Sequence, residues 1–260
     1  MIDASRGLGL FSLTDKVVVV TGATGGIGVE VSRGLSAAGA RVGLNGRRAA
    51  PVEDLAAEIS GSFALPFDIT DEAASAAALA SVVERYGRLD ALVCIAAARD
   101  RRPLAEIETD DYRTVLEANL VAPFHLARTV APHMISARRG RIIMMTSLAG
   151  EFAMPGDAAY PSSKAGLAGL VRSLAVELGV SGVNVNGIAP GPVATQVNAP
   201  LVENPEWQAM IRRTVPLQRW AEPSELAGTV IFLASDASSY INGQILTVDG
   251  GASVRLFPMD

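Results

Sequence analysis

A tyrosine and a lysine stand four residues apart in the segment Tyr160-Pro161-Ser162-Ser163-Lys164. On a helix, this spacing places both side chains on the same face. A free phenol has a pKa of about 10, and a nearby cation lowers that pKa by stabilising the phenolate. Lys164 is one of only two lysines, with Lys16, in a chain that otherwise uses arginine as its cation. The pair predicts general acid–base chemistry at Tyr160, although a surface tyrosine and lysine on an amphipathic helix would share the spacing.

A hydroxyl and an amide upstream extend this set. Ser147 lies just after the apolar segment Arg141–Met145 and thirteen residues before Tyr160. A hydroxyl at the end of a buried strand can donate a hydrogen bond to the oxygen of a carbonyl substrate. We prefer Ser147 to Thr146 because it directly precedes the turn-forming Leu-Ala-Gly. Asn119 lies in an otherwise apolar helical segment, where an amide is unfavourable unless it has a partner.

A glycine-rich segment, Thr21–Gly28, links a short apolar run to the start of a helical pattern. Glycines let the backbone turn sharply and approach a pyrophosphate closely, while a helix N-terminus presents free N–H groups to the anion. In this context the segment predicts a dinucleotide site, with an ordinary βα turn as the alternative. The expected contacts to the dinucleotide come from Gly22, Thr24, Gly26, Ile27 and Gly28.

The elements that hold these residues alternate along the chain. Short β-branched runs and longer alanine- and leucine-rich segments predict an α/β fold, a Rossmann-type doubly wound parallel sheet of about seven strands with helices on both faces. We expect strands at Lys16–Thr21, Arg41–Asn45, Phe63–Asp68, Ala91–Ile95, Arg141–Thr146, Val183–Ala189 and Gln244–Asp249. We expect helices at Gly26–Ala38, Val52–Ile59, Asp71–Tyr86, Thr109–Ser136, Ala158–Leu178 and Pro223–Ser235. No linker-like segment interrupts the pattern, so we expect one domain over residues 1–260.

Residues 191–222 form the one irregular stretch, with several prolines and both tryptophans, Trp207 and Trp220. We expect a short helix there at Glu206–Arg213. A long excursion directly after a strand's carboxyl end, where α/β proteins bind ligands, is typical of a lid or binding loop. A peripheral capping helix is the alternative.

The composition excludes several classes of function. A net charge of −5 offers no basic field to nucleic acid, and no apolar stretch is long enough to span a membrane. Cys94 is the single cysteine, and residues 1–11 lack the pattern of a secretion signal, so we expect a cytoplasmic protein. His125 and His133 share one expected helix without a carboxylate at metal-binding spacing, so we expect no metal site.

The motif Thr-Gly-x-x-x-Gly-x-Gly, followed by the serine, tyrosine and lysine at these spacings, resembles the single-domain branch of the short-chain dehydrogenase/reductase family. The resemblance extends from about Leu13 to Gly251. It implies an NAD(P)-dependent oxidoreductase whose catalytic residues are Asn119, Ser147, Tyr160 and Lys164. In such proteins the asparagine anchors a water that links the lysine to solvent. Members commonly form tetramers through the long helices, which here are apolar on more than one face, so we expect a homo-oligomer, and a tetramer in particular.

The resemblance also assigns further cofactor contacts. Asp68 and Ile69 would contact the adenine, with a helix N-cap as the alternative role of Asp68. The Pro190-Gly191 turn, the backbone of Val193 and the hydroxyl of Thr195 would hold the nicotinamide carboxamide.

One segment departs from the family. After the fourth strand relatives read Asn-Asn-Ala-Gly, where this chain reads Cys94-Ile95-Ala96-Ala97. Ala96 keeps its expected contact with the cofactor. The lost asparagine removes hydrogen bonds between neighbouring strands, and Ala97 adds a methyl group beside the cofactor ribose, so we expect weaker cofactor binding or lower local rigidity. We expect Cys94, inside an apolar strand, to be a core residue rather than a nucleophile.

Coenzyme preference is expected to depend on the end of the second strand. NAD-preferring members carry a carboxylate at the position of Gly46, where it accepts from the ribose 2′-hydroxyl. Here that carboxylate is absent and Arg47 follows, which can pair with a 2′-phosphate. The glycine loop lacks the second basic residue of many NADP users. We expect a preference for NADP(H), with NAD(H) as the alternative coenzyme.

The expected reaction interconverts a secondary alcohol and a ketone on a small polar substrate. The segments Asn45–Arg47, Arg101–Leu104 and Ile241–Gln244 resemble the gluconate 5-dehydrogenase group of the family more than acyl-carrier reductases. A sugar acid requires a cation for its carboxylate, and the nearby candidates are Arg99, Arg101 and Arg102. The alternatives are a carbonyl reductase, a 3-oxoacyl-carrier-protein or polyketide ketoreductase, and a non-catalytic dinucleotide-binding sensor or scaffold.

Overall fold

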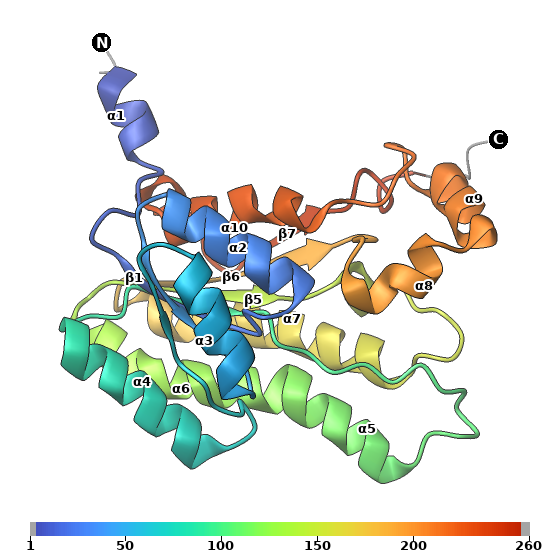
Figure 1. Cartoon of the computed structure of the whole chain (residues 1–260), viewed down its shortest axis with the longest axis horizontal. Helices are drawn as coiled ribbons and strands as arrows, with labels where there is room; N and C mark the ends of the chain where they lie inside the picture. Colours follow the sequence, from blue (N-terminus) through green and yellow to red (C-terminus); the bar gives the residue numbers. More distant parts are fainter. Residues whose placement is uncertain (1–3, 256–260) are drawn as a thin grey trace.

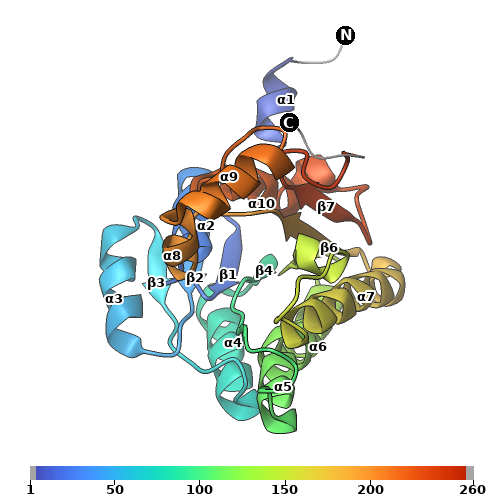
Figure 2. The ribbon, with the colours of Figure 1, turned by 90° about the vertical axis from the view of Figure 1, so that its right-hand side faces the viewer.

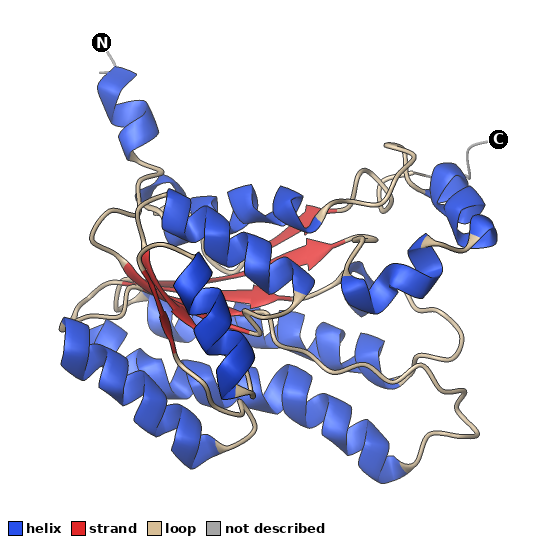
Figure 3. Ribbon diagram, viewed as in Figure 1, coloured by secondary structure: helices blue, strands red, loops and turns tan. Residues whose placement is uncertain are grey.

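The computed structural model describes residues 4–255, which fold around a seven-stranded parallel sheet (Figure 1, Figure 3). The strand order is β3-β2-β1-β4-β5-β6-β7. This arrangement confirms the Rossmann-type doubly wound sheet expected from the sequence. The strands are β1 Val17–Thr21, β2 Arg41–Leu44, β3 Ser62–Ala64, β4 Ala91–Cys94, β5 Gly140–Met145, β6 Val183–Pro190 and β7 Ile245–Val248.

Helices cover both faces of the sheet (Figure 1). One face carries α2, α3 and α10, and the other carries α4, α6 and α7. The α-helices are α1 Ala4–Gly9, α2 Gly26–Ala37, α3 Ala49–Glu58, α4 Glu72–Tyr86, α5 Thr109–Leu116, α6 Ala122–Ser136, α7 Ala159–Gly179, α8 Ala199–Val202, α9 Pro205–Thr214 and α10 Ala227–Ala234. None of the helices in the described part of the chain is long and apolar enough to cross a membrane.

The period of two in a strand explains how β1 supports both layers. Val17 and Val19 belong to the core cluster beneath α4, α6 and α7, whereas Val18 and Val20 belong to the cluster beneath α2, α3 and α10. All four valines are buried because β1 lies in the middle of the sheet. A continuous apolar run is therefore the pattern of a parallel strand that is covered on both faces.

The expected single helix Thr109–Ser136 is wrong in one respect. The structure interrupts it with a π-helical turn, Glu117–Val121, between α5 and α6. Pro123 follows this turn and has no backbone N–H to donate to the carbonyl of Asn119, so the regular ladder cannot continue there. The turn holds Asn119 fully buried.

The expected strand Phe63–Asp68 is also too long. The strand β3 ends at Ala64, although the N–H groups of Leu65 and Phe67 still donate to the carbonyls of Leu44 and Gly46. The side chain of Asn45 adds two bonds to this segment. Its Nδ2 donates to the carbonyls of Leu65, at 3.2 Å, and Phe67, at 2.9 Å. Pro66 between them has no N–H to donate.

Two helix starts differ from expectation. The third helix begins at Ala49 rather than Val52, since Pro51 fits the first turn, where N–H groups lack helical partners. The last expected helix, Pro223–Ser235, begins with a 3₁₀ turn over Pro223–Leu226, and its α-helical part is Ala227–Ala234. The helix Ala4–Gly9 was not expected from the sequence.

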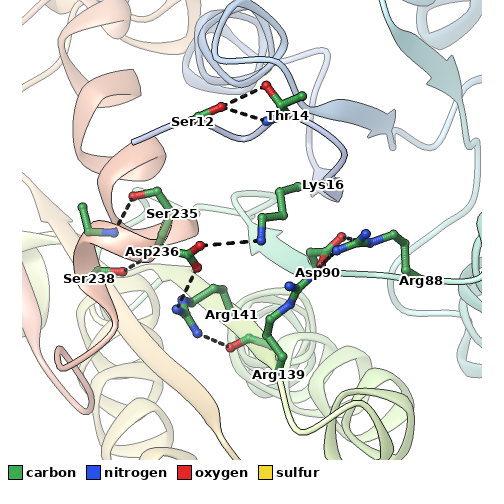
Figure 4. A network of polar contacts seen from close by, with 12 residues as sticks. Ser12, Thr14, Lys16, Arg88, Asp90, Arg139, Arg141, Ser235, Asp236 and Ser238 are labelled. Carbon is green, nitrogen blue, oxygen red and sulfur yellow. Dashed lines mark hydrogen bonds and ion pairs between the residues drawn. The ribbon is translucent and has the colours of Figure 1, made fainter. Parts of the chain in front are cut away.

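A network of charged side chains ties together the amino-terminal edge of the sheet (Figure 4). Asp90 also accepts from the backbone N–H of Val17 at 2.8 Å. The charged members, which lie at the entries of β1, β4 and β5 and in the turn after α10, are Lys16, Arg88, Asp90, Arg139, Arg141 and Asp236. These ion pairs hold the strand entries together. Lys16, the second lysine of the chain, therefore has a structural role in its pair with Asp236.

The opposite edge gathers the carboxyl ends of the strands, beside α8 and α9 (Figure 1, Figure 2). The irregular residues 191–222 lie here, and the expected helix Glu206–Arg213 is observed as Pro205–Thr214. The segment has a small core of its own around Ile211, Val215 and Trp220. A parallel bridge between Val193 and Ala221 connects its two ends.

Candidate functional site

The predicted acid–base set meets at the carboxyl end of β5. Tyr160 lies in the first turn of α7, and Lys164 follows one turn later with its Nζ 5.5 Å from the centre of the tyrosine ring. Lys164 is buried, and its Nζ donates to the carbonyl of Met145 at 2.8 Å. The strand end therefore fixes the lysine beneath the tyrosine.

The structure separates the roles of the two hydroxyls after β5. Thr146 is buried, and its hydroxyl donates to the carbonyl of Ile188 at 2.8 Å, which ties β5 to β6. Ser147 is half-buried, lines a cavity and lies close enough to the phenol of Tyr160 to lower its pKa. Of these two residues, Ser147 is the one that lines the cavity.

Asn119 acts as a bridge. Its Oδ1 accepts from the N–H of Ala98 at 2.7 Å, and its Nδ2 donates to the carbonyl of Ala98 at 2.8 Å and to the hydroxyl of Ser163 at 2.9 Å. It thus joins the loop after β4 to α7, next to Lys164 in the chain. Ser163 was not singled out from the sequence, although a serine between a tyrosine and a lysine on one helical turn was visible there.

Burial dominates the electrostatics of the pair. The pKa of Tyr160 is raised by burial, which the Ser147 hydroxyl and the Arg99 charge oppose. Burial lowers the pKa of Lys164 to about 8. A lysine with this proton affinity can hold or release a proton near neutral pH, which suits a proton-transfer site.

The glycine loop is as tight as a phosphate-binding turn requires. Gly22 has φ +66°, and a Cβ there would lie 2.7 Å from the backbone nitrogen of Ala96. A Cβ on Gly28 would lie 2.1 Å from the carbonyl oxygen of Gly22. Gly26 faces Thr195, with 3.5 Å between a Cβ built on the glycine and the threonine Cβ. Ile27 follows in the first turn of α2, and these contacts bring the loops after β1, β4 and β6 together.

The turn after β6 presents free backbone. A Cβ on Gly191, which follows Pro190, would lie 2.7 Å from the Cα of Asp249, so the turn needs a glycine. The carbonyl of Val193 accepts from the N–H of Thr195 and from Nδ2 of Asn198, both at 2.9 Å. Within residues 4–255 the N–H of Val193 has no hydrogen-bond partner, so it can donate to a carboxamide.

The expected adenine end lies beyond β2 and β3. Oδ1 of Asp68 accepts from the N–H of Thr70 at 3.0 Å and from its hydroxyl at 2.8 Å, and these bonds lower the carboxyl pKa. The N-cap alternative for Asp68 is wrong, because Asp71 caps α4. Ile69 is buried beside this turn. Arg47 is exposed and acts on Asp68 through its charge.

Packing explains the glycine at position 46. A Cβ there would lie 2.9 Å from Cγ2 of Val52 and 3.2 Å from Oγ1 of Thr24. An acidic side chain at this position would require both neighbours to move. Arg47 and Arg48 follow β2, are both exposed and form no ion pair within the described residues. The chain after β2 therefore carries two exposed positive charges.

The unusual segment after β4 is held by Thr21. Its Oγ1 accepts from the N–H of Ile95 at 3.1 Å and from the N–H of Ala96 at 3.4 Å. Cys94 is buried in the core, and burial raises its pKa to about 12, as expected for a residue that is not a nucleophile. Thr21 and Asn119 therefore supply the hydrogen bonds that hold this segment without the family's asparagines.

A cavity of about 460 Å³ opens beside Ser147. The loop after β4, the segment after β5, the turn after β6 and the helices α8 and α9 form its wall. The wall includes Arg99, Arg101, Ser147, Met154, Asp157, Leu201, Trp207, Met210 and Trp220. The cavity is thus apolar on the side of α8 and α9 and charged on the side of the loop after β4.

The three arginines of that loop have different surroundings. Arg102 is exposed and pairs with Asp100 and Asp111, outside the cavity. Arg99 pairs with the buried Asp157 and lies over the ring of Tyr160. Arg101 lines the cavity and donates to Oδ1 of Asn198 at 2.9 Å, without an ion pair in the described part of the chain.

Asp157 was missed in the sequence. It lies three residues before Tyr160 and directly before the expected helix Ala158–Leu178, and this proximity in the chain was the available signal. No group of three or more histidine, cysteine or acidic side chains that could hold a metal occurs among residues 4–255.

Comparisons with known proteins agree with this arrangement. Residues 22–253 match the family model described as enoyl-(acyl carrier protein) reductase. Gluconate 5-dehydrogenase of Gluconobacter oxydans is 37% identical over 95% of this chain and 98% of its own length. The 3-oxoacyl-[acyl-carrier-protein] reductase of Thermotoga maritima is 34% identical over 92% of this chain and 98% of its own length.

A solved structure extends the likeness to three dimensions. A gluconate 5-dehydrogenase from Burkholderia cenocepacia, in complex with NADP and tartrate, superposes with a TM-score of 0.92 at 34% identity. The match covers 96% of this chain and 99% of that protein. The chain therefore belongs to the short-chain dehydrogenase/reductase family and is an oxidoreductase.

Proposed function

We propose that this protein interconverts a secondary alcohol and a ketone on a small hydroxylated carboxylate, with NADP(H) as the preferred coenzyme. The observation that carries the proposal is the convergence of Ser147, Tyr160 and Lys164 beside a cavity lined by Arg101. This arginine forms no ion pair with any residue that the structure describes. These side chains are the donors and acceptors that carbonyl reduction requires.

In the direction of reduction, Ser147 donates a hydrogen bond to the carbonyl oxygen and Tyr160 transfers its proton to that oxygen. Lys164 stabilises the resulting phenolate by its charge, and in oxidation the same groups act in reverse. The nicotinamide supplies or accepts the hydride when it is bound. Asn119 keeps the loop after β4 and α7 in register, so the four residues act as one unit.

The residues present fit a dinucleotide. Gly22 and Gly28 form a cradle that a Cβ would fill. The N–H of Val193, which has no hydrogen-bond partner between residues 4 and 255, suits a carboxamide. Exposed Arg47 and Arg48 favour a 2′-phosphate, and Asp68 retains an oxygen that can accept from an adenine amino group. Two similar structures, described as gluconate 5-dehydrogenases, were solved with NADP bound, which supports NADP(H) as the coenzyme of this protein.

Arg101 supports an acidic substrate. It is the arginine of the loop that both lines the cavity and lacks an ion pair among the described residues, so it can bind a carboxylate. Relatives named for 5-keto-D-gluconate and D-threitol act on hydroxylated substrates. The apolar wall formed by Met154, Leu201 and Trp207 favours the runner-up, a 3-oxoacyl-carrier-protein or polyketide ketoreductase.

A substrate panel with NADPH and with NADH tests the proposal. We expect 5-keto-D-gluconate to be reduced faster than hydrophobic ketones or acyl thioesters, and NADPH to be preferred. If the acyl thioesters are reduced and 5-keto-D-gluconate is not, the sugar-acid assignment is wrong and the ketoreductase assignment takes its place. If the protein binds the dinucleotide but turns over none of the substrates, the non-catalytic sensor or scaffold is favoured.

The Tyr160→Phe variant tests the role of the phenol. Loss of the hydroxyl removes only a proton-transfer group, so turnover should fall more than tenfold while dinucleotide binding stays nearly unchanged. A variant that keeps a tenth of the activity would refute the assignment.

The proposal includes a homotetramer, a lid and a cytoplasmic location. Val176 on α7 and Val180 directly after it are 82% and 81% exposed, and Phe124 on α6 is 42% exposed, which favours a partner subunit over these helices. Residues 191–222 wall the cavity and carry their own small core, which suits a lid within a single domain. The single cysteine suits a reducing compartment. Sedimentation at micromolar concentration tests the tetramer, and a stable monomer would contradict it.

A further inference from the structure

A charged pair stands beside the tyrosine, apart from the predicted catalytic lysine. The guanidinium carbon of Arg99 lies 4.5 Å from the centre of the Tyr160 ring. Arg99 also forms an ion pair with Asp157, whose side chain is only 4% exposed. The loop after β4 and the segment before α7 thus meet over the ring.

The pair is costly to bury. Oδ2 of Asp157 accepts from Arg99, but its Oδ1 is buried without a hydrogen-bond partner in the described part of the chain. A half-satisfied buried carboxylate lowers stability, and apolar side chains of similar volume would pack there at no such cost. The pair therefore needs an explanation other than stability.

Lys164 leaves a role for a second cation. Its Nζ bonds to the carbonyl of Met145, 5.5 Å from the ring centre, and its pKa of about 8 means that its charge is lost as the pH rises. A guanidinium keeps its charge at every pH at which the protein folds. Arg99 is also closer to the ring centre than Lys164.

We propose that Arg99, held in place by Asp157, is a positioning residue that supplies a permanent positive charge to Tyr160 during proton transfer. The inference rests on the proposed role of Tyr160 as the proton-transfer group. The charged groups around the ring are Arg99, Arg101, Asp157 and Lys164. The negative charge of Asp157 reduces the effect of Arg99 on the pKa of Tyr160. In return, the ion pair with Asp157 holds the guanidinium of Arg99 in a fixed position over the ring.

The test compares four variants. Arg99→Gln removes the cation, and Arg99→Lys keeps a charge. Arg99→Gln combined with Asp157→Asn removes both charges, so no unpaired carboxylate is left buried. Arg102→Gln is the matched control, since Arg102 comes from the same loop but pairs outside the cavity.

The readout is the titration of Tyr160 itself, followed by NMR with isotope-labelled tyrosine and assigned with Tyr160→Phe. Arg99→Gln should raise the pKa of Tyr160 by about one pH unit. The double variant should raise it by less, and Arg99→Lys and Arg102→Gln should leave it near the wild-type value. The rise of kcat/KM with pH in the oxidation direction should move with the titration.

Two results would overturn the inference. One is an unchanged titration of Tyr160 in both Arg99→Gln and the double variant. The other is a loss of activity at every pH without a shift of the profile, which would mark a purely structural pair. If Arg99→Gln fails to fold, the double variant decides alone. Because the NMR readout needs no substrate, failure of the proposed function is distinguishable from failure of this inference.

Discussion

Gly28 lies so close to Gly22 that a Cβ on Gly28 would be 2.1 Å from the carbonyl oxygen of Gly22. No rotation of a side chain relieves such a contact, since both atoms belong to the backbone or are fixed to it. The start of α2 therefore depends on a glycine at this position.

Replacing Gly28 by alanine should open the turn that binds the dinucleotide. We expect dinucleotide affinity to fall at least tenfold and stability to fall by about 2 kcal/mol, as measured by isothermal titration and urea unfolding. Gly169→Ala is the control, because nothing lies within 4 Å of a Cβ on this glycine of α7. Equal affinities in both variants would contradict the role of the turn.

Removing the buried charge of Lys164 should stabilise the dinucleotide-free protein. The pKa falls from 10.5 to about 8 on folding, so the unfolded chain binds more protons between these values and stability rises with pH across this window. Below pH 8 the full cost of burial is present. Lys164→Met should therefore gain about 1 to 3 kcal/mol in urea unfolding at pH 7, and the gain should shrink toward pH 10.5. A destabilised variant at pH 7 would show that the bond to Met145 outweighs desolvation.

Cutting the bridge made by Asn119 should affect stability and turnover together. Asn119→Ala leaves the N–H and carbonyl of Ala98 and the hydroxyl of Ser163 without this partner. We expect a loss of about 2 to 4 kcal/mol in unfolding free energy and a lower kcat. Ser163→Ala removes one of the three bonds and should show a smaller loss of stability. Equal effects of the two variants would mean that the contact with Ala98 contributes little.

The coenzyme preference should depend on the exposed arginines after β2. Replacing Arg47 and Arg48 by leucine should weaken NADPH binding at least tenfold and leave NADH binding nearly unchanged, since only the 2′-phosphate loses its partners. Gly46→Asp is a poor test, because Val52 and Thr24 would have to move. Arg33→Leu, an exposed change on α2, is the control. A parallel loss of both coenzymes would place recognition of the 2′-phosphate elsewhere.

The sequence predicted those parts of the site that depend on local spacing. Tyr160 and Lys164 share a helical turn, and Ser147 follows a buried strand, so each could be placed from a few neighbouring residues. The ion pair between Arg99 and Asp157 joins residues 58 positions apart in the chain. Such a contact depends on how two loops meet above the sheet, which no local pattern records.

The element boundaries show the same distinction. The covered strands were recognisable because their apolar runs reflect burial on both faces. The interruption near Asn119 was not expected, because the apolar pattern continues through it and only Pro123 indicated a break. The segment after the early end of β3 is held in part by the side chain of Asn45, which bonds to backbone carbonyls 20 and 22 residues further on.

The π-helical turn at Glu117–Val121 makes this helix sensitive to insertions and deletions. One residue of an α-helix corresponds to about 100° of rotation and 1.5 Å of rise. The π turn takes up one extra residue, so a one-residue deletion within it would restore a regular helix. The remaining residues of the turn would then lie on different faces of that helix, although α5 and α6 would nearly keep their relative orientation. Asn119 could then no longer face both Ala98 and Ser163, although every one of these side chains would still be present. We therefore expect the insertion or deletion of one residue in this turn to lower activity and stability far more than most substitutions on the exposed face of α5.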